Sequence, residues 1–333
     1  MFLDIIIPQY AEDEMLIKKA LDSIVDQLGV DFSEIGIIII NDCSNKIISD
    51  SFLANYTKLN ITYLKNEKNM GAGLSRQRGI DYSNAKYITF LDADDYFYGN
   101  AGLQLVIACL KETNADLVQT SFIGERKDEA GLYQVKFEAD YNKAWLHAKY
   151  IKRDFLIKHN ITFSSALSNN FEDSYFCSLI NGFDFNKKKC ININYPTYYW
   201  CYNKESITRK EGKHHYYVDA FDDYMLCPEL VYDRLKSHNK YFADIYLRQA
   251  ICNIYIILMS KIFDGKDLIE RKNNYRQKFI DLVKSHIDCL KKTTKKSFRE
   301  TYKEKLKALE INLGIEINIE DIDCFFIANN IYF

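Results

Sequence analysis

The chain has 333 residues, of which 47% are hydrophobic and 27% are charged, and its formal net charge is −2. This composition is that of a globular protein with one large domain or two ordinary ones. The absence of a basic excess argues against a dedicated nucleic-acid-binding protein, for which a basic face is expected.

Nine cysteines are scattered singly, without a C-x-x-C pair. This pattern favours free thiols in a reducing cytosol over a disulfide framework or a zinc site. The N-terminal segment has no basic leader, and the apolar run 250–259 is shorter than the roughly 20 residues that span a bilayer. We therefore expect a cytoplasmic protein.

The first 120 or so residues alternate between short apolar runs and helical patterns. Strands are predicted at 3–7, 35–40, 61–64, 87–91 and 116–122. Helices are predicted at 17–28, 72–85 and 101–110, the second weakened by Gly79. Strands separated by helices indicate a parallel, layered α/β sheet.

Polar side chains follow each of the first four predicted strands. They are Gln9, Tyr10 and Glu12; Asn41 and Asp42; Asn66, Asn69 and Gly71; and Asp92, Asp94 and Asp95. In an open parallel sheet the carboxyl ends of the strands meet at one edge, where such sheets bind ligands. We therefore expect these four clusters to converge on one site.

Three carboxylates, Asp92, Asp94 and Asp95, stand within four residues directly after an apolar segment. Like charges this close repel one another, so a compensating cation is expected. Mg²⁺ and Mn²⁺ prefer oxygen ligands and take one or two carboxylates, with substrate phosphates completing the coordination. The alternative interpretation is a helix-capping turn, which also favours Asp.

Four segments carry a resemblance to a known family. IIIPQYAEDEMLIKKALDSIVDQ, IIIINDCSN, NEKNMGAGLSRQRGI and YITFLDADD stand in the order and spacing of family 2 glycosyltransferases of the GT-A fold. The match is good over about residues 3–98 and thins towards about 210. The resemblance implies a Rossmann-like, mostly parallel sheet flanked by helices. It also implies metal-dependent, inverting transfer of a sugar from a nucleotide sugar, here most simply a UDP-sugar.

The resemblance also implies roles for single residues. Pro8 and Tyr10 would line the nucleobase pocket, and Asp42 would accept the imide N–H of the base. Asn69 and Arg76 would reach the base and the diphosphate. These roles suit the residue types, since an aromatic ring stacks on a base and a guanidinium matches phosphate. Without the resemblance, Arg76 reads equally well as a surface charge on a helix.

The D-A-D segment completes this implied nucleotide site. Asp92 would lie by the ribose and Asp94 would hold Mn²⁺ or Mg²⁺ together with Asp92, with Ala93 between them. Three positions depart from the family pattern, and we expect them to alter supporting hydrogen bonds; they are Ala11, Asn41 and Gln77.

The segment NNFEDSYF resembles the Glu-Asp motif of the family, whose Asp is the general base in inverting members. Asp173 is the predicted base, with Glu172 as a supporting or competing carboxylate. The acceptor hydroxyl must lose its proton as it attacks the anomeric carbon, and a carboxylate within hydrogen-bond reach can take it. The alternative is that both acids simply begin a helix, where they suit the dipole.

The aromatic segment YYWCYNKESITRK is strand-like and resembles the segment that follows the base in this family. Tyr199 and Trp200 are candidates to stack on a sugar. Candidates to contact the diphosphate are Ser206, Thr208 and Arg209. His214 or His215 reads either as an added metal ligand or as part of a solvent-exposed pair.

The pattern turns helical after about residue 215. We divide the chain into a GT-A domain, 1–214, and a helical domain, 215–333, for acceptor presentation or oligomerisation. Within the first, 1–98 binds the nucleotide sugar, and 99–214 forms the acceptor side and supplies the base. The basic stretch 290–307 reads as a solvated helix face or, alternatively, a peripheral contact with the inner face of a membrane or with an anionic acceptor. Tyr255 and Phe263 are candidate contacts of a homodimer.

The sequence leaves the sugar and the acceptor open. The sugar is expected to be a hexose or an N-acetylhexosamine, and the acceptor a glycan, glycopolymer, lipid carrier or protein in cell-surface glycan synthesis. A sugar nucleotidyltransferase is one alternative, but it normally has a glycine-rich basic loop after the first strand, whereas PQYAEDE is acidic. A non-catalytic binding or scaffolding module is the other, and Asp92, Asp94 and Asp173 speak against it.

Overall fold

The computed structural model describes residues 1–127, 131–138, 144–167, 170–184, 189–203, 218–260, 263, 268–291, 298–313 and 321–332. The chain forms two compact units, Met1–Lys204 and Glu205–Phe333. The boundary expected at 214/215 falls within 204–217, outside the described residues.

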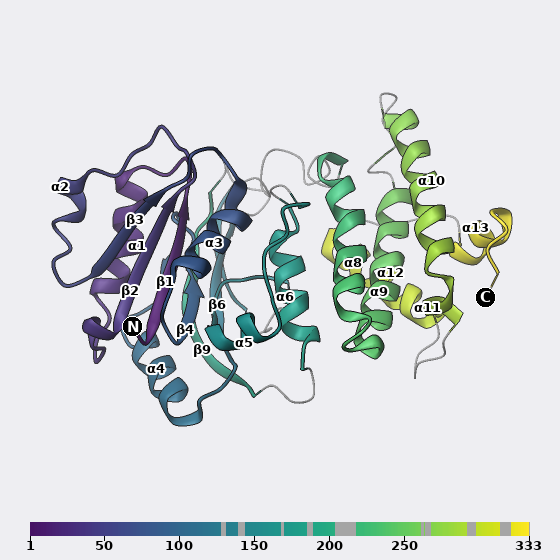
Figure 1. The fold of residues 1–333 in the computed structure, drawn as a ribbon. Coiled ribbons are helices and arrows are strands. Elements are labelled where there is room, and N and C mark those ends of the chain that lie inside the picture. The colour runs from purple at the N-terminus through teal and green to yellow at the C-terminus, as the bar shows by residue number, and fades with distance from the viewer. Residues whose placement is uncertain are drawn as a thin grey trace. The chain divides into compact units, whose positions relative to one another are not determined.

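The first unit is built on a mixed sheet with nine strands in the described residues (Figure 1). The strands are β1 Leu3–Gln9, β2 Ile35–Asn41, β3 Asn60–Lys65, β4 Tyr87–Phe90, β5 Tyr96–Phe97, β6 Leu117–Lys127, β7 Tyr133–Glu138, β8 Lys149–Lys152 and β9 Cys190–Trp200. Their order is β3-β2-β1-β4-β8-β6-β9-β5, and β7 pairs with β6. The helices are α1 Glu14–Val25, α2 Asp50–Leu53, α3 Gly71–Tyr82, α4 Gly102–Thr113, α5 Arg153–Lys158 and α6 Glu172–Gly182, with a 3₁₀ turn at Phe32–Glu34.

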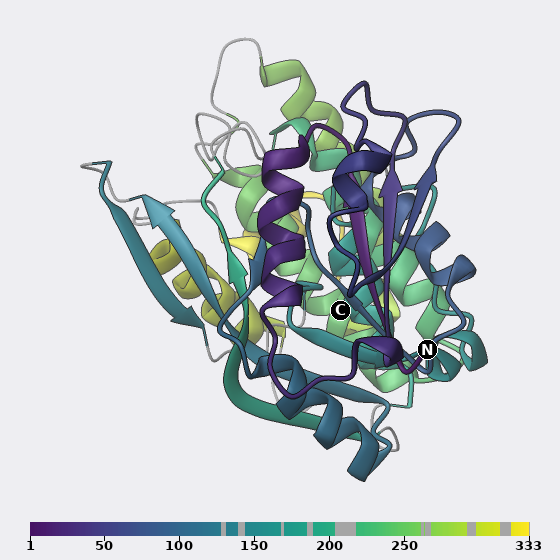
Figure 2. The same ribbon diagram turned by 90° about the vertical axis from the view of Figure 1, so that its left-hand side faces the viewer.

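The parallel arrangement predicted for the first four strands is confirmed. β3, β2, β1 and β4 are mutually parallel, and each of the first three predicted helices lies within a few residues of its expected range. The second half of the sheet differs from the expectation of a mostly parallel sheet, because β8 enters antiparallel between β4 and β6. The β6–β7 hairpin supplies a further antiparallel pair and extends away from the sheet (Figure 2).

Strand alternation divides the core into two layers. The odd-numbered residues of β1 and β2, such as Ile5 and Ile37, pack in one cluster with the buried stripe of α1 and with α4. That stripe consists of Ile17, Ala20, Leu21 and Ile24. The helix was predicted to reach residue 28 but ends at Val25, and Leu28 is exposed. On the other face, Phe90 of β4 meets Phe163 and Phe176 edge to face.

Gly79 explains why α3 carries a glycine in mid-helix. A Cβ at this position would lie 2.5 Å from Ile6 Cγ2 and 3.1 Å from Ile40 Cδ1, so the helix backbone rests directly on β1 and β2. Only a residue without a side chain permits this approach, which carries the start of α3 close to the strand ends.

Gly79→Ala is therefore expected to lower the free energy of unfolding by about 1–3 kcal/mol, the usual cost of overpacking a core. Urea denaturation measures this change. Gly124→Ala is the matched control, since its Cβ would meet Trp200 at an ordinary 3.5 Å. Equal effects at both positions would contradict the packing argument.

The second unit is helical, as predicted. Its helices are α8 Phe221–Leu235, α9 Lys240–Met259, α10 Ile269–Ser285, α11 Ile287–Lys291, α12 Phe298–Leu313 and α13 Ile322–Ala328. Tyr255 and Phe263 are fully buried, so these two side chains do not offer the dimer contact left open by the sequence. Tyr255 packs instead on Phe279 and Phe325.

Helix α9 is longer than the apolar run 250–259 seen in the sequence. Its 20 residues are long and apolar enough to cross a bilayer by length and composition, which corrects the expectation from the run 250–259. However, 61% of its most apolar window is buried inside the protein, as in the core helix of a globular unit.

Candidate active site

The four polar clusters meet at one edge of the sheet, as expected. The register aligns Gln9 with Asn41 and Asn41 with Lys65, while Ile6 aligns with Phe90 at the end of β4. The loops after β1, β2, β3 and β4 therefore leave the sheet side by side. Helix α6, from a later part of the chain, brings its first residues to the same place.

Arg76 on α3 lies at the centre of this edge. Its Nη2 donates to Asp92 at 2.7 Å, and its Nη1 donates to Asp173 at 2.9 Å and to Glu172 at 3.4 Å. The side chain is only 6% exposed, which excludes the alternative of a surface charge. Burial lowers the pKa of Arg76, but the three carboxylates more than offset this and raise it, so the guanidinium stays charged.

The predicted base opens helix α6. Glu172 is buried and Asp173 is 31% exposed, so Asp173 is the carboxylate with better access to an acceptor. Burial raises the pKa of Asp173, and Arg76 opposes that rise. The first turn of the helix also carries these acids, so the capping and the catalytic interpretations describe the same geometry.

The three aspartates after β4 have different surroundings. Asp92 is 38% exposed and paired with Arg76. Asp94 is half-buried and accepts a hydrogen bond from Asn203 Nδ2 at 2.9 Å. Asp95 is fully buried, and its two oxygens accept from Tyr198 Oη at 2.6 Å and from the Cys201 amide at 2.8 Å. Burial and the neighbouring Asp94 and Asp92 raise the Asp95 pKa well above its usual range. Asp95 is thus the structural member of the group, and it ties β9 to the loop after β4.

Asp95→Ala is expected to destabilise the first unit by about 3 kcal/mol, since a buried hydroxyl and a buried amide lose their acceptor. Urea denaturation followed by circular dichroism gives the value. Asp26→Ala, at an exposed aspartate, serves as the control and should stay within about 0.5 kcal/mol of the unchanged protein. A comparable loss in both variants would remove the structural role from Asp95.

Asp42 holds the loop that leads into α3. One oxygen accepts from Asn66 Nδ2 at 2.7 Å and from the Met70 amide at 2.8 Å, and the other accepts from the Gly71 amide at 2.7 Å. A carboxylate has about four acceptor positions, so one remains for a base N–H. Of the other nucleobase candidates, Tyr10 is 54% exposed, Asn69 is exposed and Pro8 is half-buried.

Of the three residues that depart from the family pattern, Asn41 and Gln77 make hydrogen bonds that support the site, whereas Ala11 is exposed. Asn41 is buried and donates to Tyr63 Oη and to the Lys46 carbonyl. Gln77 accepts from the Phe163 amide at 2.9 Å and so fastens α3 to the segment before α6.

Backbone strain gathers around this edge. Seven described non-glycine residues have positive φ, and four of them are Asn or Asp, which adopt this conformation readily. The other three are Cys43, Ala148 and Phe171. Cys43 follows Asp42, Ala148 precedes Lys149, and Phe171 precedes Glu172. Strain of this kind persists where the surrounding structure fixes the conformation, as it does at functional sites.

Glu12 is a residue of this edge for which no role was predicted. Its carboxylate accepts from the amides of Tyr10 and Ala11, which fixes the turn after β1. Burial raises its pKa, and the charges of Asp94 and Asp92 add to the rise. Asp94 and Asp92 are therefore close enough for their charges to act on Glu12.

The donor set fits a divalent cation. Carboxylate oxygens are the ligands that Mg²⁺ and Mn²⁺ prefer, and a hard cation would relieve the repulsion just described. Among the described residues no three acidic, His or Cys side chains form a ready-made metal cage. Asp94 and Asp92 suit a metal that shares its coordination with phosphate oxygens.

Two further side chains were missed because they lie outside the four motifs. Lys149 at the start of β8 is buried, donates to the Trp145 carbonyl at 2.5 Å and lowers the Asp173 pKa. His147 stacks on Tyr198 with ring centroids 5.0 Å apart. Burial lowers its pKa to about 3, so the ring is neutral. The alternation of Trp145, His147 and Lys149 was the available signal for this side of the site.

The aromatic candidates on β9 have separate environments. Tyr199 stacks on Tyr96 at 4.5 Å and donates to Glu125 at 2.8 Å. Trp200 packs near Trp145 and His147 on the other face of the strand. The remaining candidates, Ser206, Thr208, Arg209, His214 and His215, lie outside the described residues.

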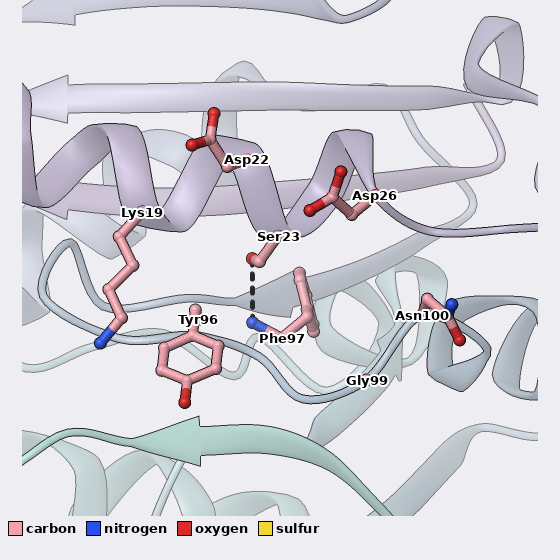
Figure 3. Close-up of a pocket in the computed structure, with 8 residues that line it drawn as sticks. All are labelled: Lys19, Asp22, Ser23, Asp26, Tyr96, Phe97, Gly99 and Asn100. Atoms are coloured by element: carbon pink, nitrogen blue, oxygen red, sulfur yellow. Dashed lines mark hydrogen bonds between the residues drawn. The ribbon is translucent and has the colours of Figure 1, made fainter.

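A separate hollow of about 730 Å³ lies between α1 and the loop after β5 (Figure 3). Its lining includes Lys19 and Asp22 of α1, Asp26 just after it, and Tyr96 and Asn100, and Lys19 extends towards Tyr96. It contains none of the residues assigned to the nucleotide, and Lys19 lies over the Tyr96 ring at 4.3 Å.

The chain is similar to several known proteins. A "Glycosyltransferase GlyA" of Streptococcus pneumoniae serotype 4 is 26% identical over 39% of this chain and 18% of its own length. A poly(ribitol-phosphate) beta-glucosyltransferase of Bacillus spizizenii is 26% identical over 64% of this chain and 33% of its own length. The chain thus spans less than two thirds of these relatives. The crystal structure of S. aureus TarS 1-349 in complex with UDP has a TM-score of 0.59 at 18% identity, covering 87% of this chain and 81% of that one.

The family assignment follows from the sequence profile described as "Glycosyl transferase family 2". This profile matches residues 4–174, about half of the chain and the whole stretch from β1 to the predicted base. The GT-A-like fold agrees with it. The chain belongs to glycosyltransferase family 2.

Proposed function

We propose that this enzyme transfers a sugar from a UDP-sugar to a hydroxyl group of a glycopolymer acceptor, with inversion and with Mn²⁺ or Mg²⁺. The observation that carries the proposal is that Arg76 joins Asp92 to Asp173 at the sheet edge where the segments carrying Asp42 and Asp94 also leave the strands. A cytoplasmic location suits the nine cysteines, which form no disulfides.

The donor is proposed from the nucleotide end of the site. The exposed ring of Tyr10 offers a face for a nucleobase, and Asp42 keeps an acceptor position for an imide N–H. The structurally similar TarS binds UDP in its complex. The acceptor position favours a base with a ring N–H, uracil or guanine, over adenine, and the UDP complex of TarS makes uridine the first nucleotide to test.

The acceptor class is proposed from the relatives. The Bacillus spizizenii relative is named for transfer to poly(ribitol-phosphate), and another, from Bacillus subtilis, is named as a minor teichoic acid biosynthesis protein. Both names describe polyol-phosphate or related cell-wall polymers, so an anionic glycopolymer is the first acceptor to test.

The reaction needs one base and one charge-stabilising group. Asp173 would take the proton of the acceptor hydroxyl as its oxygen attacks the anomeric carbon, while the bond to the diphosphate breaks on the opposite face. When bound by Asp94 and Asp92, Mn²⁺ or Mg²⁺ would stabilise the negative charge that develops on the departing diphosphate. A single displacement of this kind inverts the configuration at the anomeric carbon.

A thermal-shift screen followed by a transfer assay tests the proposal. UDP with Mn²⁺ is expected to raise the melting temperature more than GDP with Mn²⁺ or UDP with EDTA, because a ligand that binds only the folded state stabilises it. Radiolabelled UDP-sugars with a poly(ribitol phosphate) acceptor then identify the product. If UDP-sugars bind but are neither transferred nor slowly hydrolysed, the protein is a non-catalytic module. A preference for GDP would reject the uridine assignment.

A further inference from the structure

The contacts of Arg76 differ from those of a phosphate ligand. This guanidinium is 6% exposed and already bonded to protein carboxylates. Both of its terminal nitrogens are used, Nη2 by Asp92 and Nη1 by Asp173 and Glu172. Three donor contacts of the terminal nitrogens are therefore made to protein carboxylates before any substrate arrives, while the buried Nε has no partner among the described residues.

The partners of Arg76 come from three separate elements. Arg76 is on α3, Asp92 follows β4, and the two acids begin α6. The planar guanidinium holds these carboxylates in fixed directions, which a flexible ammonium group does less well. It therefore fixes where the Asp173 carboxylate points relative to Asp92.

The first turn of α6 needs such a partner. Phe171 has φ of +60°, and α6 has no side-chain hydrogen bond at its N-cap. Since no capping side chain fixes the start of α6, the ion pair with Arg76 is a main contact that holds the Asp173 side chain among the described residues. Glu172 is itself packed over α3, since a Cβ on Gly73 would lie 3.0 Å from Glu172 Cγ.

We propose that Arg76 is a positioning residue that orients the Asp173 carboxylate and joins it to Asp92, and that it is not a ligand of the donor diphosphate. This inference rests on the proposed function, in which Asp173 is the base. It replaces the diphosphate contact that the family resemblance implied for Arg76.

A double-mutant cycle tests whether Arg76 acts through Asp173. Arg76→Gln is expected to lower kcat by about 10²-fold, and the double variant Arg76→Gln, Asp173→Asn is expected to be no slower than Asp173→Asn within about threefold. Two losses that multiply would overturn the proposal. If Asp173→Asn alone retains full activity, the proposed base fails, and this outcome is distinct from a failed cycle.

A binding measurement separates positioning from phosphate contact without using activity. Calorimetry on each variant gives the ratio of the dissociation constants of UDP and uridine with Mn²⁺ present. For Arg76→Gln this ratio is expected to stay within about threefold of that of the unchanged protein. A tenfold or greater weakening confined to UDP would assign Arg76 to the diphosphate and overturn the inference.

Arg76→Lys covers the case in which Arg76→Gln does not fold. Lysine keeps the charge among the carboxylates but lacks the fork geometry, so kcat is expected to fall about tenfold while KM and the UDP-to-uridine ratio change little. A raised KM with unchanged kcat would contradict positioning. Arg126→Gln, which removes an exposed arginine paired with Glu138 at 3.1 Å, is the matched control and should leave both constants unchanged.

Discussion

Asp173→Asn is expected to lower kcat by about 10³-fold, within the range that a general base contributes, while UDP binds with unchanged affinity. The amide keeps the shape of the side chain but cannot accept the proton of the acceptor hydroxyl. Single-turnover kinetics with saturating UDP-sugar measure the loss, and calorimetry measures UDP binding. Retained turnover would reject Asp173 as the base and direct attention to Glu172.

The same experiment has a pH signature. A base works only when ionised, so kcat should decline as the pH is lowered through the pKa of Asp173. Because burial raises this pKa, the decline should begin at a higher pH than it would for an ordinary aspartate. The decline should be missing from the residual activity of Asp173→Asn. Asp184→Asn is the control, since Asp184 lies just beyond the same helix and pairs with Lys158 at 2.8 Å away from the site; it should leave kcat and its pH dependence unchanged.

Asp94→Asn is the second variant with a large expected effect. Removing the proposed metal-binding carboxylate should lower kcat by about 10²-fold or more, the scale of losing one group that stabilises developing charge. It should also abolish the Mn²⁺-dependent part of UDP affinity. Calorimetry with UDP in Mn²⁺ and in EDTA measures this part directly.

The control for Asp94→Asn is Asp50→Asn, the same change at an exposed aspartate. It should leave kcat and the effect of EDTA on UDP affinity as they are in the unchanged protein. If Asp94→Asn keeps the full difference between Mn²⁺ and EDTA, the metal does not bind at Asp94.

The position of the site was predictable because it depends on local patterns. Apolar runs followed by polar residues mark strand ends, and parallel strands bring those ends together, which the register of β1, β2 and β4 confirms. The start of α6 at Glu172 was also foreseeable from the acids that open it. These features need no knowledge of distant contacts.

The distinct roles of Asp92, Asp94 and Asp95 were not predictable, because the three share one side-chain type. Their roles depend on Arg76, Asn203 and Tyr198, and the last two lie more than 100 residues further along the chain. The antiparallel insertion of β8 was equally hidden, since a four-residue strand has too little periodicity to reveal its direction. Lys149 and His147 went unassigned for the same reason.

The position of β9 has a practical consequence for shortened forms of this enzyme. The matched family region stops at residue 174, yet β9 lies inside the sheet between β6 and β5, and Tyr198 of β9 and Cys201 just after it are the partners of Asp95. A fragment that ends at residue 174 would lack β9 and leave the edge of β6 unpaired, and such an exposed strand edge promotes aggregation. The smallest piece worth expressing therefore continues to at least residue 203, whatever the family boundary suggests.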